Sequence, residues 1–168
     1  MQKKRFFLVF LLTVFTVTIF NDGFGGIFFV NTTGSVPRGL YMRIPGVLRC
    51  GDLVVYRPTD EVQKLVIRRG YNNSESMLFM KYVGALECNS YGVNIKDLSF
   101  EVKGKIIGKA MLKDSNGLIM PIKFGANVVP QGHFLPIAKT ERSFDGRYTG
   151  TESLDRIRAR VIPILVEW

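Results

Sequence analysis

The distribution of apolar residues divides the chain at about residue 30. Residues 6–20 form an apolar run without a charged side chain, and after Asn21 and Asp22 the apolar character resumes up to Val30. Beyond that point, short apolar stretches alternate with glycine, proline and asparagine, which is the pattern of strands joined by turns. We therefore expect residues 1–30 to hold a membrane anchor and residues 31–168 to form one domain, which is large enough for a single core.

The domain is predicted to be mainly β, with antiparallel strands. Asn116-Gly117 is a typical hairpin turn and is expected to join residues 110–112 to residues 118–122. A short helical turn is expected within residues 154–160. The stretches expected to form strands are residues 39–43, 53–56, 77–86, 100–102, 106–111, 133–137 and 161–166.

One stretch has the periodicity of a helix instead. Val62 and Val66 lie on one helical face. Asp60, with Gln63 three positions later, is expected to cap the start of this helix, and Gly70 is expected to end it. The predicted architecture is thus an antiparallel β domain with one short helix, preceded by an N-terminal transmembrane helix.

The N-terminal segment fits a retained anchor better than a cleaved signal peptide. Its apolar run is shorter than the roughly 20 residues of a typical span, and signal peptides also begin with basic residues such as those at positions 3–5. A signal peptide ends in small residues, however, and Gly23-Phe24-Gly25 is a poor match. With its basic tip inside, the chain is expected to cross the membrane once and to place its domain in the periplasm or the exterior.

The charge of the chain indicates which partners to expect, and its cysteine and histidine content indicates whether a disulfide or a zinc site can form. The formal net charge of +9 over 168 residues favours acidic surfaces, of which anionic lipid headgroups are the nearest. No nucleic-acid-binding signature accompanies the scattered basic residues, so nucleic acid is not expected as a partner. Cys50 and Cys88 are expected either to form one disulfide or to remain free thiols. Two cysteines and one histidine cannot form a structural zinc site alone, and no metal or cofactor is expected.

Ser35 is the first residue with catalytic potential. It lies in Asn-Thr-Thr-Gly-Ser-Val-Pro-Arg-Gly-Leu-Tyr at residues 31–41, directly after the expected anchor. Gly34 allows the backbone to approach a ligand closely. Pro37 biases the residue before it towards an extended conformation. Taken alone, this segment fits a polar linker leaving the membrane better than it fits a nucleophile.

Lys81 supplies a candidate base. Apolar residues surround it almost completely in Leu-Phe-Met-Lys-Tyr-Val-Gly at residues 78–84. A serine hydroxyl needs an adjacent base, and a lysine can serve if burial lowers its pKa. Taken alone, a lysine in a strand more often extends its amine to solvent. His133, the only histidine, is the rival base, but no acidic residue lies close in sequence to orient it.

A third polar segment follows at residues 139–150, where we expect a loop. Ser143, Asp145 and Arg147 occupy alternate positions, which would share one face of an extended strand. Asp145 and Arg147 are expected to hold the loop together and to leave Ser143 to hydrogen-bond a neutral lysine amine. Taken alone, this segment also fits an ordinary surface turn.

Three segments in this order resemble the signal peptidase I superfamily, and most closely its TraF-type conjugal-transfer peptidases. They are Ser-x-Pro-x-Gly-x-Tyr after an anchor, a lysine in an apolar strand, and Ser-x-Asp-x-Arg-Tyr-x-Gly. Gly-Asp-Leu-Val-Val at residues 51–55 and Arg-Gly-Tyr at residues 69–71 also fit that branch. The resemblance spans nearly the whole domain and implies a signal-peptidase-like antiparallel β fold.

The resemblance also implies a role for each matching residue. The nucleophile would attack a peptide carbonyl, and the general base would take its proton and return it to the leaving amine. Two donors would stabilise the oxyanion. These roles fall to Ser35 as nucleophile, Lys81 as base, the Ser35 amide and the Thr33 hydroxyl in the oxyanion hole, Ser143 as the residue that orients the lysine, and Asp145 with Arg147 as structural support.

The chain departs from the pattern of the superfamily at several positions. Residues 138–142 read Ala-Lys-Thr-Glu-Arg where many relatives carry Gly-Asp or Asp-Asn, and Gly146 stands where serine is common. Val36 replaces the methionine that follows the nucleophile in housekeeping enzymes. These departures argue against general secretory processing and leave Ser35 and Lys81 untouched.

The expected function is that of a membrane-anchored serine endopeptidase that processes a pilin or another exported precursor in a conjugation or secretion system. Water would resolve its acyl-enzyme by hydrolysis, or the amino end of the same chain would do so and give a cyclic pilin. Two alternatives stay open, namely a general leader (signal) peptidase and a non-catalytic assembly component of a secretion complex. The joint presence of Ser35, Lys81 and Ser143 argues against the non-catalytic assembly component. Tyr41, Ile44 and Met80 are candidates for the walls of a substrate pocket.

Overall fold

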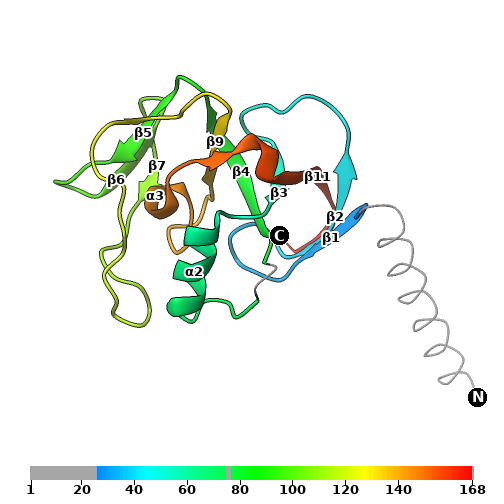
Figure 1. Cartoon of the computed structure of the whole chain (residues 1–168), viewed down its shortest axis with the longest axis horizontal. Coiled ribbons are helices and arrows are strands. Elements are labelled where there is room, and N and C mark those ends of the chain that lie inside the picture. The colour runs from blue at the N-terminus through cyan, green and yellow to red at the C-terminus, as the bar shows by residue number, and fades with distance from the viewer. Residues whose placement is uncertain (1–25, 75–76, 168) are drawn as a thin grey trace, which may run out of the picture.

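A curled antiparallel sheet forms the frame of the molecule (Figure 1). The computed structural model describes residues 26–74 and 77–167. Within these residues the fold is mainly β with few helices, as predicted. No helix in the described ranges is long and apolar enough to cross a membrane. The expected anchor run, residues 6–20, lies outside the described residues.

The larger sheet has seven strands in the order β1-β2-β11-β3-β4-β9-β10. All neighbouring strands in it are antiparallel. Its strands are β1 (Phe28–Asn31), β2 (Gly39–Ile44), β3 (Leu53–Tyr56), β4 (Phe79–Leu86), β9 (His133–Ile137), β10 (Glu152–Ser153) and β11 (Ile157–Val166).

A second sheet of four strands has the order β7-β6-β5-β8 and packs beside the first. Phe100 from this sheet, Leu135 from β9 and Tyr148 lie buried in one apolar cluster, which joins the two sheets into a single core. The strands of the second sheet are β5 (Ser90–Val93), β6 (Ser99–Val102), β7 (Lys105–Lys109) and β8 (Asn127–Val128).

The helices of the described residues are α2 (Asp60–Arg68), α3 (Gly146–Thr149) and the 3-10 turn η1 (Leu154–Arg156). Helix α2 is the one predicted from the sequence, but Thr59 occupies its N-cap position and Asp60 is already helical. The Gln63 amide donates to the Pro58 carbonyl, so it reinforces the start of the helix in another way. Gly70 ends the helix as predicted, with φ of +71°.

The predicted strands agree with the structure where the sequence pattern is local. β3 and β9 have the predicted bounds, and β2, β4, β6 and β11 differ only at their ends. Residues 110–112 and 118–122 were expected to pair as strands, but only the bridge Lys113–Ile119 forms between them. The reason is that Arg69 binds Asp114 at 2.8 Å, which ties the Asn116-Gly117 turn to the end of α2 rather than to the sheet.

β1 begins earlier than the predicted domain boundary. Phe28 to Val30, which the sequence assigns to the anchor, pair with β2, so the folded domain includes residues before 31. The four strands β1, β5, β8 and β10 were not predicted. β8 and β10 are only two residues long, β1 lies within the apolar run assigned to the anchor, and β5 is interrupted by Gly92.

β4 changes partners along its length, and this leaves room for a site. Its first half pairs with β3 from Phe79 to Tyr82, and its second half pairs with β9 from Tyr82 to Leu86. Residues 79–81 therefore have no strand partner on the β9 side among the described residues. β1, the terminal strand of the sheet, likewise has one unpaired edge.

Close packing of α3 against β9 predicts that Gly146 cannot carry a side chain. A Cβ at this position would lie 2.5 Å from Leu135 Cδ1 and 2.7 Å from the Pro136 carbonyl oxygen. We expect Gly146→Ala to lower the free energy of unfolding by about 1–3 kcal/mol, measured by urea denaturation. Gly34→Ala is the control, because a Cβ there meets nothing within 4 Å. Equal stability of the two variants would contradict this account.

Candidate active site

A cleft of about 660 Å³ opens between the two unpaired strand edges. One wall is formed by the end of β1 and the loop after it, and the other by the start of β4 with Leu78, Phe79 and Met80. Helix α2, residues 111–120 and residues 141–148 contribute the remaining surface. Most of the lining is apolar, while Ser35 and Lys81 contribute polar groups to it.

Ser35 and Lys81 meet at this cleft, with Ser143 buried beside them. The Lys81 amine lies 2.6 Å from Ser35 Oγ and 2.6 Å from Ser143 Oγ. The two hydroxyl oxygens are 3.2 Å apart. The structure thus brings together three residues that are far apart in sequence, and the lysine amine is within hydrogen-bond reach of both serines.

Burial changes the acid–base properties of Lys81. The residue is 5% exposed and lies on β4 opposite Val54 of β3. Desolvation lowers the pKa of its amine from 10.5 to about 8, while Asp145 raises it and Arg147 lowers it. A substantial fraction of the side chain is therefore neutral near pH 8 and able to accept a proton.

Asp145 and Arg147 form a fully buried ion pair beside the lysine. Arg147 Nε lies 2.9 Å from Asp145 Oδ1, and Nη2 lies 3.2 Å from Oδ2. The arginine also donates to the main-chain carbonyls of Lys109 and Ala138. Asp145 accepts the Ala138 amide at 2.8 Å. Burial raises the pKa of the Asp145 carboxyl, and Arg147 and Lys81 oppose that rise.

The segment that carries these residues begins as the expected loop, but it ends in the short helix α3 and its three polar residues are buried rather than at the surface. Asp145 is the N-cap of α3 and accepts the main-chain amide of Arg147, which is itself helical. Ser143, Asp145 and Arg147 are all buried. Their alternation therefore does not place them on one face of a strand. It places the ion pair inside the turn and leaves the Ser143 hydroxyl pointing at Lys81.

The loop of Ser35 is organised by a residue to which the sequence analysis gave no role. Asn31 is 7% exposed, and its side chain hydrogen-bonds to Thr33, Val36 and Pro37 on both sides of the serine. The Ser35 main-chain amide donates to no acceptor among the described residues. The only signal in the sequence is an asparagine at the end of an apolar strand, directly before a Thr-Thr-Gly-Ser turn.

The remaining candidates lie elsewhere. His133 Nδ1 is 3.0 Å from the Gln131 carbonyl oxygen, and the ring does not line the cleft. Met80 lines the cleft as expected. Tyr41 is instead buried in the core with its hydroxyl on the Pro37 carbonyl, and Ile44 lines a separate hollow. Both cysteines are exposed and unpaired.

Comparisons with known proteins assign neither a family nor a function to this chain. No protein-family model matches this chain, and no curated protein matches it either. In the part of the chain that the structure describes, no group of three or more His, Cys, Asp or Glu side chains could hold a metal ion. A function must therefore be argued from the geometry of the cleft and its three polar residues.

Burial of Lys81 predicts a cost to stability that depends on pH. Lowering its pKa from 10.5 to about 8 costs the folded state roughly 3 kcal/mol at pH 7. We expect Lys81→Met to raise the free energy of unfolding at pH 7 by about 2 kcal/mol, because Ser35 and Ser143 lose a partner in exchange. Urea denaturation over a series of pH values measures this gain.

The gain should shrink as the pH rises from about 8 towards 10.5. In that window the unfolded wild-type chain binds a proton that the folded chain has released, so wild-type stability increases with pH. Lys64→Met is the control, because Lys64 is exposed on α2. A Lys81→Met variant that is less stable than wild type at every pH would refute the account.

Proposed function

We propose that this chain is a membrane-anchored serine endopeptidase that uses a Ser/Lys dyad. The observation that carries the proposal is the position of the buried Lys81 amine, 2.6 Å from both Ser35 Oγ and Ser143 Oγ. A lysine whose pKa is lowered to about 8 is a competent general base, and a serine at this distance is a competent nucleophile.

The proposed reaction begins with transfer of the Ser35 hydroxyl proton to the neutral Lys81 amine. Ser35 Oγ bonds to the carbonyl carbon of the scissile peptide, and the main-chain amide of Ser35 donates to the oxyanion that forms. Lys81 then returns the proton to the leaving amine as the C–N bond breaks. Ser143 holds the lysine amine in line with Ser35 through its own hydrogen bond.

The edges of the cleft support an extended peptide as substrate. β1 has one unpaired edge, and residues 79–81 of β4 lack a strand partner on the β9 side. Both segments line the cleft that holds Ser35 and Lys81. A peptide added between them as a strand would hydrogen-bond through its main chain and present a carbonyl to Ser35. The apolar lining favours apolar side chains near the scissile bond.

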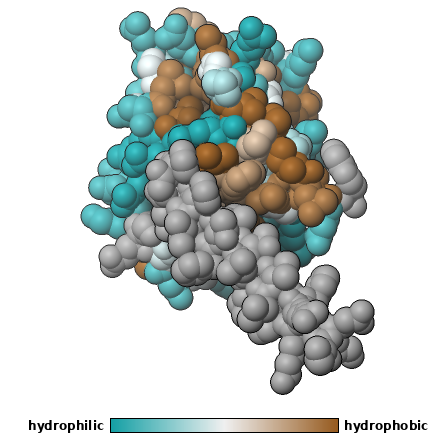
Figure 2. Space-filling view, turned by 90° about the vertical axis from the view of Figure 1, so that its right-hand side faces the viewer, coloured by the Kyte–Doolittle hydropathy of each residue, from teal (hydrophilic) through white to brown (hydrophobic). Residues whose placement is uncertain are grey.

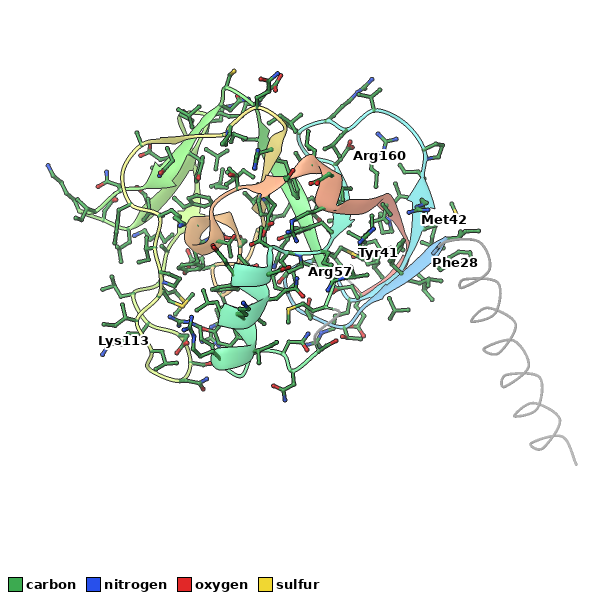
Figure 3. The ribbon with its side chains drawn as sticks, in the orientation of Figure 1. Phe28, Tyr41, Met42, Arg57, Lys113 and Arg160 are labelled. Carbon is green, nitrogen blue, oxygen red and sulfur yellow. The ribbon has the colours of Figure 1, made fainter. Side chains whose placement is uncertain are left out.

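The outward face of β1, β2 and β11 supports a location at the membrane. Leu40 of β2 pairs with Val30 of β1 on one side and with Leu165 of β11 on the other, which places these three side chains on one face. Val30 is 71% exposed and Leu165 is 75% exposed. Figure 2 shows apolar side chains gathered on this side of the molecule. Figure 3 shows Phe28 and Met42, which are also paired, at the outer edge of the same sheet.

An apolar sheet face in this position is unusual for a domain surrounded by water. It lies next to the first described residues, where the expected anchor would join the domain. We propose that the domain rests against the periplasmic surface of a bacterial inner membrane, held there by the N-terminal segment. The net charge of +9 favours anionic lipid headgroups at this surface.

The resemblance to TraF-type peptidases directs the proposal towards a pilin or another exported precursor as substrate. Water or the amino end of the substrate chain would release the acyl group, and the catalytic residues are the same in both cases. Mass spectrometry of the mature product separates these outcomes. A linear product means hydrolysis, and a product lighter by one water means cyclisation.

Three substitutions test the assignment of the dyad on processing of the precursor. We expect Ser35→Ala and Lys81→Ala each to lower cleavage by at least about 10³-fold, because each removes a reacting group. His133→Ala should process normally, since His133 does not line the cleft. Loss of activity in His133→Ala with intact folding would overturn the Ser/Lys assignment.

The same assay distinguishes the alternatives. Cleavage of many unrelated secretory precursors would indicate a general leader peptidase. Full restoration of pilus production by a Ser35→Ala chain in a deletion strain would indicate a non-catalytic assembly protein. The hydrogen bonds of Lys81 to Ser35 and Ser143 argue against the assembly protein, whereas a general leader peptidase would use the same dyad and is separated only by its range of substrates.

The lysine base also predicts the pH dependence of the reaction. Because only the neutral amine accepts a proton, kcat/KM should rise about tenfold per pH unit below a pKa of about 8 and level off above it. A histidine base would instead give a midpoint near its ordinary pKa of about 6.5. Rate profiles from pH 5.5 to about 10 on a peptide substrate separate the two.

A further inference from the structure

We infer that Asn31 is a positioning residue that holds the Ser35 loop against Lys81 and accepts the hydrogen bond of the Thr33 hydroxyl. This inference rests on the peptidase function proposed above. It assigns a role to a residue that does not touch the reacting atoms, and it changes the role that the resemblance implies for Thr33.

The amide nitrogen of Asn31 donates to three main-chain carbonyls. Its Nδ2 lies 2.8 Å from the Thr33 oxygen, 3.0 Å from the Val36 oxygen and 3.1 Å from the Pro37 oxygen. Thr33 precedes Ser35 by two residues, and Val36 and Pro37 follow it directly. One buried side chain therefore fixes the main chain on both sides of the candidate nucleophile.

The carbonyl oxygen of Asn31 completes this arrangement. Oδ1 accepts the Thr33 main-chain amide at 3.3 Å and the Thr33 hydroxyl at 2.9 Å. The orientation of the side-chain amide follows from these partners, because three carbonyls surround its nitrogen and two donors face its oxygen. Among the described residues, the loop between β1 and β2 pairs with no strand. The hydrogen bonds of Asn31 therefore take the place of the main-chain hydrogen bonds that a neighbouring strand would provide.

Only asparagine satisfies this set of partners at this length. Aspartate would direct a carboxylate oxygen at three carbonyl oxygens, and leucine would supply no polar atom. Glutamine adds a methylene group to a residue that is 7% exposed. Ser35 Oγ depends on this loop for its 2.6 Å distance to Lys81. A displacement of the serine by about 1 Å is enough to slow a reaction by about 10²-fold.

The contact to Asn31 also limits what Thr33 can do. A threonine hydroxyl has one proton, and the Asn31 oxygen can only accept, so the proton lies between these two residues. It is then not available to a substrate oxyanion. The main-chain amide of Ser35, which has no acceptor among the described residues, remains as the donor from this loop.

Kinetics of the full-length chain test the role of Asn31. We expect Asn31→Ala and Asn31→Asp to lower kcat by about 10²-fold with KM within roughly threefold of wild type. This split is expected because the substrate still binds along the strand edges while Ser35 is displaced from Lys81. Asn89→Ala is the matched control, since Asn89 binds the Leu86 and Glu87 carbonyls in a remote turn and its loss should leave kcat unchanged.

A double-mutant cycle tests the role of Thr33. Thr33→Val should lower kcat less than about threefold in the wild-type background and not at all in Asn31→Ala, because the hydroxyl acts through Asn31. If Thr33 instead donates directly to the oxyanion, Thr33→Val should lower kcat by about 10²–10³-fold in both backgrounds. That result would overturn the assignment of the Thr33 proton.

Hydrogen exchange separates failure of this inference from failure of the proposed function. Exchange of the Thr33 main-chain amide, which donates to Asn31 Oδ1, should be at least about tenfold faster in Asn31→Ala than in wild type, with no change in Asn89→Ala. This measurement does not require activity. A wild-type chain that cleaves no precursor would refute the peptidase proposal alone. Unchanged exchange in Asn31→Ala would overturn the present inference even for an active enzyme.

Discussion

The buried ion pair between Asp145 and Arg147 is the interaction on which the rest of the structure depends. Arg147 donates to the Lys109 carbonyl at the end of β7 and to the Ala138 carbonyl after β9, so it joins the two sheets. Its guanidinium also lies 5.2 Å from the Phe100 ring centroid in the core. Because every donor and acceptor of the pair has a partner, two charges can be buried at a point where three segments of the chain meet. Ser143 owes its position beside Lys81 to this arrangement.

The same ion pair explains how a lysine can be buried without being held in its charged form. A single carboxylate next to Lys81 would raise the pKa of the amine and keep it protonated. Here Asp145 raises that pKa and Arg147 lowers it, so desolvation decides the outcome and the pKa falls to about 8. Neutral hydroxyls of Ser35 and Ser143 supply the hydrogen bonds that the amine needs. The site thus holds a lysine with a lowered pKa in surroundings whose net charge is close to zero.

Local patterns in the sequence predicted β3, β9 and the end of α2, and the apolar neighbours of Lys81 correctly indicated its burial. In the polar segment at residues 139–150 the sequence correctly predicted the pairing of Asp145 with Arg147 and the contact of Ser143 with Lys81, but not the short helix α3 or the complete burial of the ion pair, because its charges neutralise each other inside the fold rather than in water. Asn31 could not be found from the sequence for a related reason. Its partners are mainly main-chain carbonyls, which every residue has, so no sequence pattern marks them.

This dependence on main-chain partners has a consequence for how such a site can be retained while the sequence changes. Asn31 and Arg147 fix the path of the backbone without requiring particular side chains at Val36, Pro37 or Ala138. Packing still limits which side chains these positions accept, because Val36 and Ala138 are buried. Gly146 is limited further, since the Leu135 side chain and the Pro136 carbonyl leave no room for a Cβ. A few polar residues and close backbone contacts, rather than an extended sequence signature, hold this candidate site together.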